Sequence, residues 1–147
     1  MTTSTVTTIN APAPPTSPGP TWRIGAAAGL VAAAATMAVA AAADGLGVSL
    51  QTGPGETIPV IGFAQLTLFF TAVGVVIARV LGRRARGPRA TFIRTTVALT
   101  ALSLGPDVLL HAAVATKLTL IATHLVAAAI VVPALAGRLK VTGRHAN

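Results

Sequence analysis

Four apolar stretches constrain this chain more than any other feature. They cover about residues 24–43, 58–81, 92–111 and 118–137. At about 1.5 Å per helical residue, about twenty residues match the hydrocarbon thickness of a bilayer, about 30 Å. Backbone groups in hydrocarbon must be hydrogen-bonded internally, which only helices and closed barrels achieve. We therefore expect an all-α membrane protein, an up-and-down bundle of four transmembrane helices.

Composition supports a lipid environment. The mean hydropathy is +0.77, with 53% hydrophobic and 10% charged residues, which leaves too little polar surface for a water-soluble globule of this size. The absence of cysteine excludes disulfides, thiolate metal sites and thiol nucleophiles. No other nucleophile or metal-ligand motif stands out, so we expect neither catalytic residues nor a cofactor. Abundant arginine and alanine are typical of a high-GC bacterium.

Polar tails flank the apolar region. Residues 1–22 are rich in threonine and proline and predict a disordered cytoplasmic tail. Residues 23–137 form the predicted transmembrane domain, and residues 138–147 form a basic cytoplasmic tail. The link over 44–59 is rich in glycine and proline, which favours turns over a long helix.

The distribution of charge predicts an orientation. Four crossings place the two ends and the middle link on one side, and that side receives ten of the eleven Lys and Arg residues. The acids Asp44, Glu56 and Asp107 fall on the other side, together with Lys117. By the positive-inside rule we expect a multi-pass protein of the bacterial plasma membrane with both termini cytoplasmic. The ten are Arg23, Arg79, Arg83, Arg84, Arg86, Arg89, Arg94, Arg138, Lys140 and Arg144.

The first apolar stretch has a second interpretation. Arg23, the apolar run and the small residues at 41–43 resemble a signal peptide with its cleavage site. The run is longer than a typical signal core, which favours a retained helix. Gly25, Gly29 and Ala33 form a small-residue stripe along this helix, which predicts close packing either with a second copy or with a neighbouring helix of the same chain.

The middle link carries an arginine cluster that indicates contact with anionic lipid headgroups. Each basic residue near a membrane surface contributes about 1 kcal/mol. The cluster is short and lacks interleaved aromatic residues, so we expect no nucleic acid partner. Its members are Arg83, Arg84, Arg86 and Arg89.

Pro106 interrupts the third apolar stretch. Proline removes a helical hydrogen bond and disfavours the helical conformation of the preceding residue, so we expect a kink or an end near Gly105.

Four ionisable residues lie where lipid makes them costly. If the helix resumes after Pro106, Asp107 and His111 share one face, and Lys117 and His124 share a face of the fourth helix. We expect these four to converge between the third and fourth helices. Asp107 would then pair with Lys117, and His124 would hydrogen-bond to the third helix.

Several interpretations of this cluster stay open. A polar clamp between two helices is the one we favour, and it fits a non-enzymatic structural or accessory membrane subunit. The alternative is a small oligomeric transporter or channel with a proton or ion relay through Asp107, His111, Lys117 and His124. Metal or haem ligation by the histidines is a third, although the spacing matches no known metal motif. Besides lipid, the partner expected is a second copy or another membrane protein.

Several segments resemble a family of small actinobacterial membrane proteins designated domain of unknown function 6069. The similarity covers about residues 23–137 and implies four membrane helices without an activity. It is carried by Gly62-Phe63-Ala64-Gln65-Leu66, Leu104-Gly105-Pro106, Ala115-Thr116-Lys117-Leu118-Thr119-Leu120, His124-Leu125-Val126 and Val132-Pro133-Ala134-Leu135.

Overall fold

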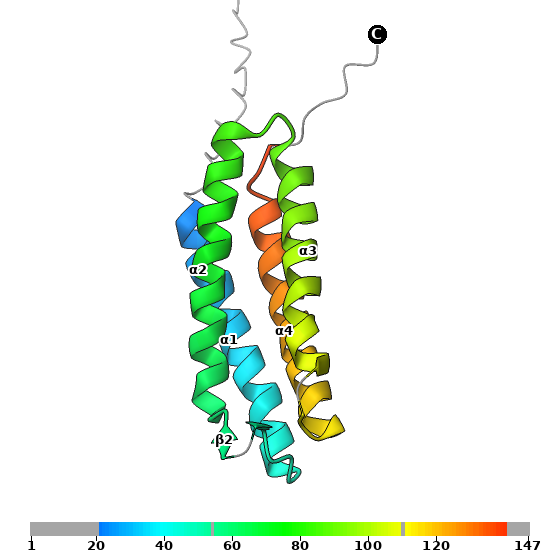
Figure 1. Ribbon diagram of the computed structural model, residues 1–147. Coiled ribbons are helices and arrows are strands. Elements are labelled where there is room, and N and C mark those ends of the chain that lie inside the picture. Colours follow the sequence, from blue (N-terminus) through cyan, green and yellow to red (C-terminus); the bar gives the residue numbers. More distant parts are fainter. Residues whose placement is uncertain (1–20, 54, 110, 141–147) are drawn as a thin grey trace, which may run out of the picture.

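The computed structural model describes residues 21–53, 55–109 and 111–140, and over these ranges the chain forms a bundle of four long helices. Each helix runs antiparallel to the next along the chain (Figure 1). All four are long and apolar enough to cross a membrane, which confirms the predicted all-α fold class. The tails predicted over 1–22 and 138–147 lie largely outside the described residues. The helices are α1 (Thr21–Gly45), α2 (Val60–Arg84), α3 (Pro88–Leu109) and α4 (Val114–Ala136).

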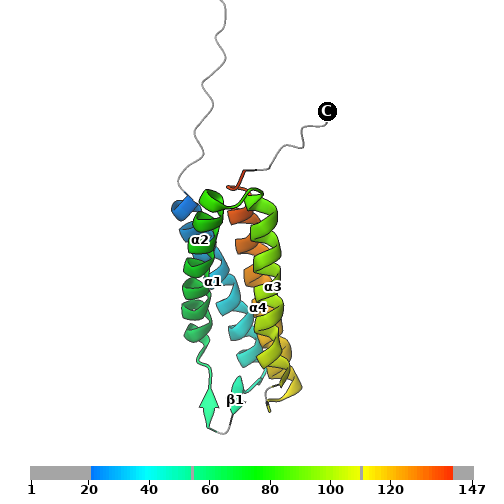
Figure 2. The ribbon, with the colours of Figure 1, turned by 45° about the horizontal axis from the view of Figure 1, so that its top comes forward.

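The bundle has two chemically different ends. The start of α1, the α2–α3 link and the end of α4 lie together at the top of Figure 1, and the other two links lie at the bottom. Figure 2 shows the same arrangement from a tilted direction. The top end therefore gathers every described arginine and Lys140, and we call it the cationic end. The bottom end, which carries Asp44 and Glu56, is the acidic end.

The helices extend beyond the apolar stretches on which the sequence prediction was based. α1 begins at Thr21, α2 ends at Arg84 and α3 begins at Pro88. Helical backbone continues where charged side chains begin because a long arginine side chain reaches outward from an apolar stem. Proline also suits the first turn of a helix, where its missing N–H has no helical partner.

Pro106 does not end α3, which continues to Leu109. Of the two outcomes predicted near Gly105, a kink or an end, the end is therefore wrong. So close to the C-terminus proline breaks a single helical hydrogen bond, and its fixed φ is itself helical. Membrane helices tolerate such prolines when neighbouring groups compensate.

The α1–α2 link contains a short antiparallel hairpin that sequence reasoning did not predict. It consists of β1 (Gln51–Gly53) and β2 (Glu56–Thr57). Gly55, with φ +79°, adopts the left-handed conformation that glycine accepts without strain. Leu50 adopts φ 50° and is fully buried, so packing holds this side chain in place against the cost of its backbone conformation.

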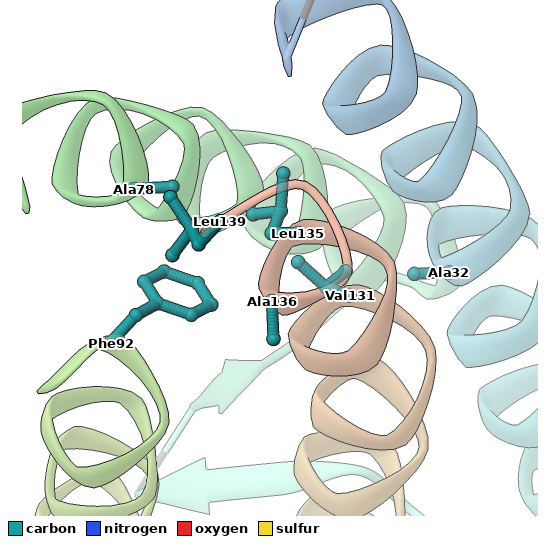
Figure 3. Packing of buried hydrophobic residues seen from close by; sticks show 7 residues of the cluster. All are labelled: Ala32, Ala78, Phe92, Val131, Leu135, Ala136 and Leu139. Carbon is teal, nitrogen blue, oxygen red and sulfur yellow. The ribbon is translucent and has the colours of Figure 1, made fainter. Parts of the chain in front are cut away.

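Two hydrophobic clusters fill the interior. Figure 3 shows the one near the cationic end, in which Phe92 of α3 points toward Leu135 and Leu139, with Ala32, Ala78, Val131 and Ala136 around them. The second lies near the acidic end and contains Ala40, Leu50, Phe63 and Leu120. Each half of the bundle therefore has its own apolar core.

Small residues bring α1 close to its neighbours. Gly25 and Gly29 are buried, and a Cβ atom at Gly25 would collide with Val75 of α2 and approach Leu135 of α4 to 3.5 Å. A Cβ atom at Gly29 would lie 3.0 Å from a methyl carbon of Thr71. The glycine stripe is thus used for packing inside the same chain, which is one of the two roles predicted for it.

The outside of the bundle is apolar, and α3 is its least buried helix. Twenty-two large hydrophobic side chains in the described part of the chain are exposed. α3 buries only Pro88, Phe92 and Asp107, whereas α1 buries seven residues. α3 is therefore fixed at its two ends, by Phe92 near one and by Asp107 near the other.

Candidate functional site

Asp107 and His124 form a contact between α3 and α4 near the acidic end. Nδ1 of His124 lies 3.2 Å from Oδ2 of Asp107. Asp107 is 7% exposed, while His124 keeps about a third of its side chain accessible, 34%. Asp107 is the sole acidic side chain that the described ranges bury. A buried carboxylate is costly unless it is paired, so loss of this contact should destabilise the α3–α4 interface.

The hydrogen on His124 Nδ1 is directed elsewhere. Nδ1 lies 2.9 Å from the carbonyl oxygen of Leu120, one turn earlier on α4. Because that carbonyl can only accept, Nδ1 donates to it. Asp107 Oδ2 consequently lies beside His124 but receives no directed hydrogen bond from any described residue. The imidazole is thus oriented by a hydrogen bond within α4, and the same ring nitrogen also contacts the carboxylate of Asp107.

Lys117 strengthens the same interface through the backbone. Its Nζ donates to the carbonyl oxygen of Val108 at 2.8 Å. Val108 lies in the last turn of α3, where carbonyl groups lack helical partners and the helix dipole favours a positive charge. The sequence-based pairing of Lys117 with Asp107 is therefore wrong: the ammonium group caps α3, and His124 takes the position beside the carboxylate.

His111 does not join the other three residues. α3 ends at Leu109, so His111 lies in the turn before α4 and is exposed. The expectation that it shares a helical face with Asp107 required the helix to continue through residue 111, which it does not. In the described ranges, no group of three His, Cys, Asp or Glu side chains is placed to hold a metal ion.

Sequence reasoning missed a polar stripe on α3. Thr96, Thr100 and Ser103 belong to the less exposed side of the helix and continue toward Asp107 at spacings of four, three and four. Thr96 donates to Phe92 O and Ser103 to Thr100 O, at 2.8 Å each. The spacing follows the helical repeat and was the available signal. α3 therefore turns hydroxyls toward the bundle and apolar side chains outward.

Buried hydroxyls also line α4 near this interface. Thr116, Thr119 and Thr123 are all buried. Thr119 donates to Ala115 O at 2.9 Å and Thr123 to Leu120 O at 2.8 Å, whereas Thr116 Oγ1 has no hydrogen-bond partner in the part of the chain described. Gln65 of α2, which belongs to one of the segments that carry the family resemblance, is exposed.

The arginines of the α2–α3 link extend from the cationic end. Arg83 and Arg84 belong to the last turn of α2, where positive charge suits the helix dipole. Arg86 lies in the link and Arg89 in the first turn of α3, and all four side chains are exposed. This placement leaves Arg83, Arg84 and Arg89 available to a membrane surface.

Removing the Lys117 cap gives the first testable expectation. In Lys117→Met the apolar stem is kept and the ammonium group is lost, so the end of α3 loses a charge-assisted hydrogen bond. We expect the free energy of unfolding to fall by about 0.5–1 kcal/mol, because a cation at a helix C-terminus and an interhelical hydrogen bond in a membrane each contribute about this much. Amide hydrogen exchange should accelerate in residues 105–109 and stay unchanged in the middle of α4. Equal exchange in both proteins would contradict the assignment.

Comparison with known proteins adds a family but no activity. No curated protein and no solved structure matches the chain. A family model matches residues 16–141, which covers all four helices and the Asp107–His124 contact. That span exceeds half of the 147 residues, and the protein therefore belongs to the family of unknown function DUF6069.

Proposed function

We propose that the protein is a multi-pass protein of the bacterial plasma membrane that acts as a non-enzymatic structural or accessory subunit. The observation that carries this proposal is the use of the polar residues between α3 and α4. Asp107 contacts His124, and Lys117 caps Val108, so three of the four candidate side chains hold one helix to the next. Their contacts resemble a helix clamp more than an exposed reaction centre.

The same proposal includes an orientation, with both termini and the α2–α3 link in the cytoplasm. It is supported by the positive-inside rule, because the cationic end carries every described arginine and the acidic end carries Asp44 and Glu56. α1 is retained in this scheme, since seven of its residues are buried in the bundle.

The lack of cysteine makes orientation directly measurable. Ala90 and Ser49 are exposed and lie at opposite ends of the bundle, so each is replaced by cysteine in a separate protein. In intact cells we expect a membrane-impermeant maleimide to label Ser49→Cys and to leave Ala90→Cys unlabelled until the cells are opened. Labelling of Ala90→Cys in intact cells would reverse the orientation, and labelling of both would refute the four-span topology.

A second function, a proton relay, is favoured by a specific observation. Oδ2 of Asp107 is buried without a directed hydrogen bond, and the hydroxyls of Ser103, Thr100 and Thr96 follow it along α3. Carboxyl, imidazole and hydroxyl groups are the components of known intramembrane relays. Phe92 and its cluster close the path toward the cationic end, so a relay requires α3 to move or copies of the chain to assemble.

Proton flux separates the relay from the clamp. The protein is placed in liposomes with an imposed pH gradient, and internal pH is followed by a pH-sensitive dye. If the relay operates, we expect flux above empty liposomes that Asp107→Asn abolishes and Asp44→Asn leaves intact. Asp44 is the matched control, because it is an exposed acid at the same end of the bundle. Wild-type flux equal to empty liposomes would reject the relay and leave the subunit proposal standing.

A further inference from the structure

A groove runs along the outer surface between α1 and α2 in the half of the bundle nearest the cationic end. Its volume is about 230 Å³. The exposed residues of its lining are Trp22 and Ala26 of α1 and Leu68 and Ala72 of α2, and the buried Gly25 and Gly29 also border it. Trp22 directly precedes Arg23. The lining is mostly apolar, and about half of the Trp22 side chain, 53%, is exposed.

The groove exceeds what a small apolar molecule needs. A cavity of about 150 Å³ lined by apolar side chains accommodates benzene. A volume of 230 Å³ therefore has room for a longer hydrocarbon segment, such as part of one acyl chain. Because the groove opens sideways from the bundle, an acyl chain can enter it from the surrounding lipid without leaving hydrocarbon.

Two arginines flank the mouth of the groove. Arg79 follows Val75 by four residues, and Arg23 precedes Ala26 by three, so both continue the lining faces of their helices by about one turn. Both side chains are exposed. Positive charge at the end of an apolar groove complements a lipid that has an anionic headgroup.

The chain supplies no acidic side chain to neutralise them. It contains three acids. Asp44 and Glu56 lie at the acidic end, and Asp107 contacts His124 in the same half of the bundle. The counter-charge for Arg23 and Arg79 must come from outside the chain, and basic pockets between membrane helices on the cytoplasmic side are known to select anionic lipid headgroups.

We propose that this groove binds one anionic phospholipid, with an acyl chain against the exposed Ala26, Leu68 and Ala72 and the phosphate between Arg23 and Arg79. In this arrangement the exposed Trp22 is next to the phosphate-binding arginine Arg23, and an indole ring is favoured at the interface between lipid and water. The inference rests on the proposed membrane orientation, which makes the cytoplasmic leaflet the source of the lipid. It assigns a discrete site, separate from diffuse attraction to the arginine cluster of the α2–α3 link.

The test is native mass spectrometry of delipidated full-length protein in detergent, titrated with phosphatidylglycerol or with phosphatidylcholine of the same acyl chains. We expect a first equivalent of phosphatidylglycerol to bind more tightly than phosphatidylcholine. The double variant Arg23→Gln/Arg79→Gln should weaken that equivalent about 30-fold, from two basic contacts of about 1 kcal/mol each. Arg84→Gln/Arg89→Gln changes the charge equally and should leave it within about twofold of wild type. Arg89 belongs to α3, which lines no part of the groove, and Arg84 lies nine residues beyond Val75, the last lining residue of α2.

A second pair of variants tests the apolar half of the site without touching charge or core. Ala72→Phe fills the groove from an exposed position, and Ala98→Phe makes the same change at an exposed position of α3. We expect Ala72→Phe alone to reduce binding of phosphatidylglycerol. Equal loss in both double arginine variants, or equal binding of the two lipids, would overturn the site. A dimer lost in Ala72→Phe without dependence on phosphatidylglycerol would assign the groove to a second copy instead. Cysteine labelling reports orientation independently of all these outcomes.

Discussion

Replacing His124 by leucine should lower the free energy of unfolding by about 2 kcal/mol, and a second substitution, Asp107→Asn, should restore most of it. Removing one partner of a fully buried ion pair costs about 3–5 kcal/mol, because the other charge stays buried alone. Asp107 is 7% exposed, but His124 keeps 34% of its side chain accessible, so water or headgroups offset part of that cost. The expected value is therefore lower than for a fully buried pair.

The single substitution Asp107→Asn should lower the free energy of unfolding much less than His124→Leu. In Asp107→Asn, the partly exposed imidazole keeps its hydrogen bond to Leu120 O, and no charge is left buried. The lost contact is then comparable to an average interhelical hydrogen bond in a membrane, about 0.6 kcal/mol. The double variant should match Asp107→Asn closely, since it also lacks a buried charge.

Unfolding by sodium dodecyl sulfate in mixed micelles, followed by circular dichroism, measures all three variants on one scale. The informative quantity is the difference between the stability losses of His124→Leu and Asp107→Asn. If Asp107→Asn costs as much as His124→Leu, the cost of His124→Leu does not come from a carboxylate left buried without its neighbour. If the double variant is less stable than His124→Leu, the two residues act independently and the clamp is refuted.

Gly25→Leu should destabilise the bundle by about 3 kcal/mol. A Cβ atom at Gly25 already collides with Val75 and lies 3.5 Å from Leu135, so a leucine must separate α1 from both α2 and α4. Overpacking of a well-filled interior costs about 1–3 kcal/mol, and contact with two helices at once favours the upper value.

Gly45→Leu provides the matched control. Gly45 is the last residue of α1, and a Cβ atom there meets nothing within 4 Å. We expect a change within about 0.5 kcal/mol, as for other surface substitutions. The same detergent titration measures both proteins. Equal stability of the two variants would show that the close approach of α1 to its neighbours contributes little to the fold.

Much of this architecture follows from the sequence because lipid imposes a simple rule. A stretch of about twenty apolar residues has one stable conformation in hydrocarbon, so the number and order of the helices could be predicted. The ends of the helices could not be predicted from hydropathy, because hydropathy falls at Arg83 and Arg84 while the backbone of α2 stays helical. The hairpin over 51–57 depends on local turn geometry, for which the sequence offered only glycine and proline.

The site was predicted in part for a related reason. The spacing of Asp107 and His124 placed them near one interface, but the partner of Asp107 depends on the turn between α3 and α4. Because α3 ends at Leu109, His111 lies outside the interface and Lys117 reaches the backbone of Val108. The stripe of Thr96, Thr100 and Ser103 was visible as a helical repeat. It was missed because such hydroxyls commonly bond to their own helix, as Thr96 and Ser103 do here.

The way α3 is held has a consequence for how the protein is made. It is the least apolar of the four helices, and its hydroxyl face and Asp107 make it a poor candidate for entering lipid alone. α4 follows after a short turn. Its His124 and Lys117 contact Asp107 and the Val108 carbonyl, which an isolated α3 would expose to lipid. α3 and α4 are therefore suited to leave the translocation machinery together as one helical hairpin, in which α4 satisfies the polar groups of α3.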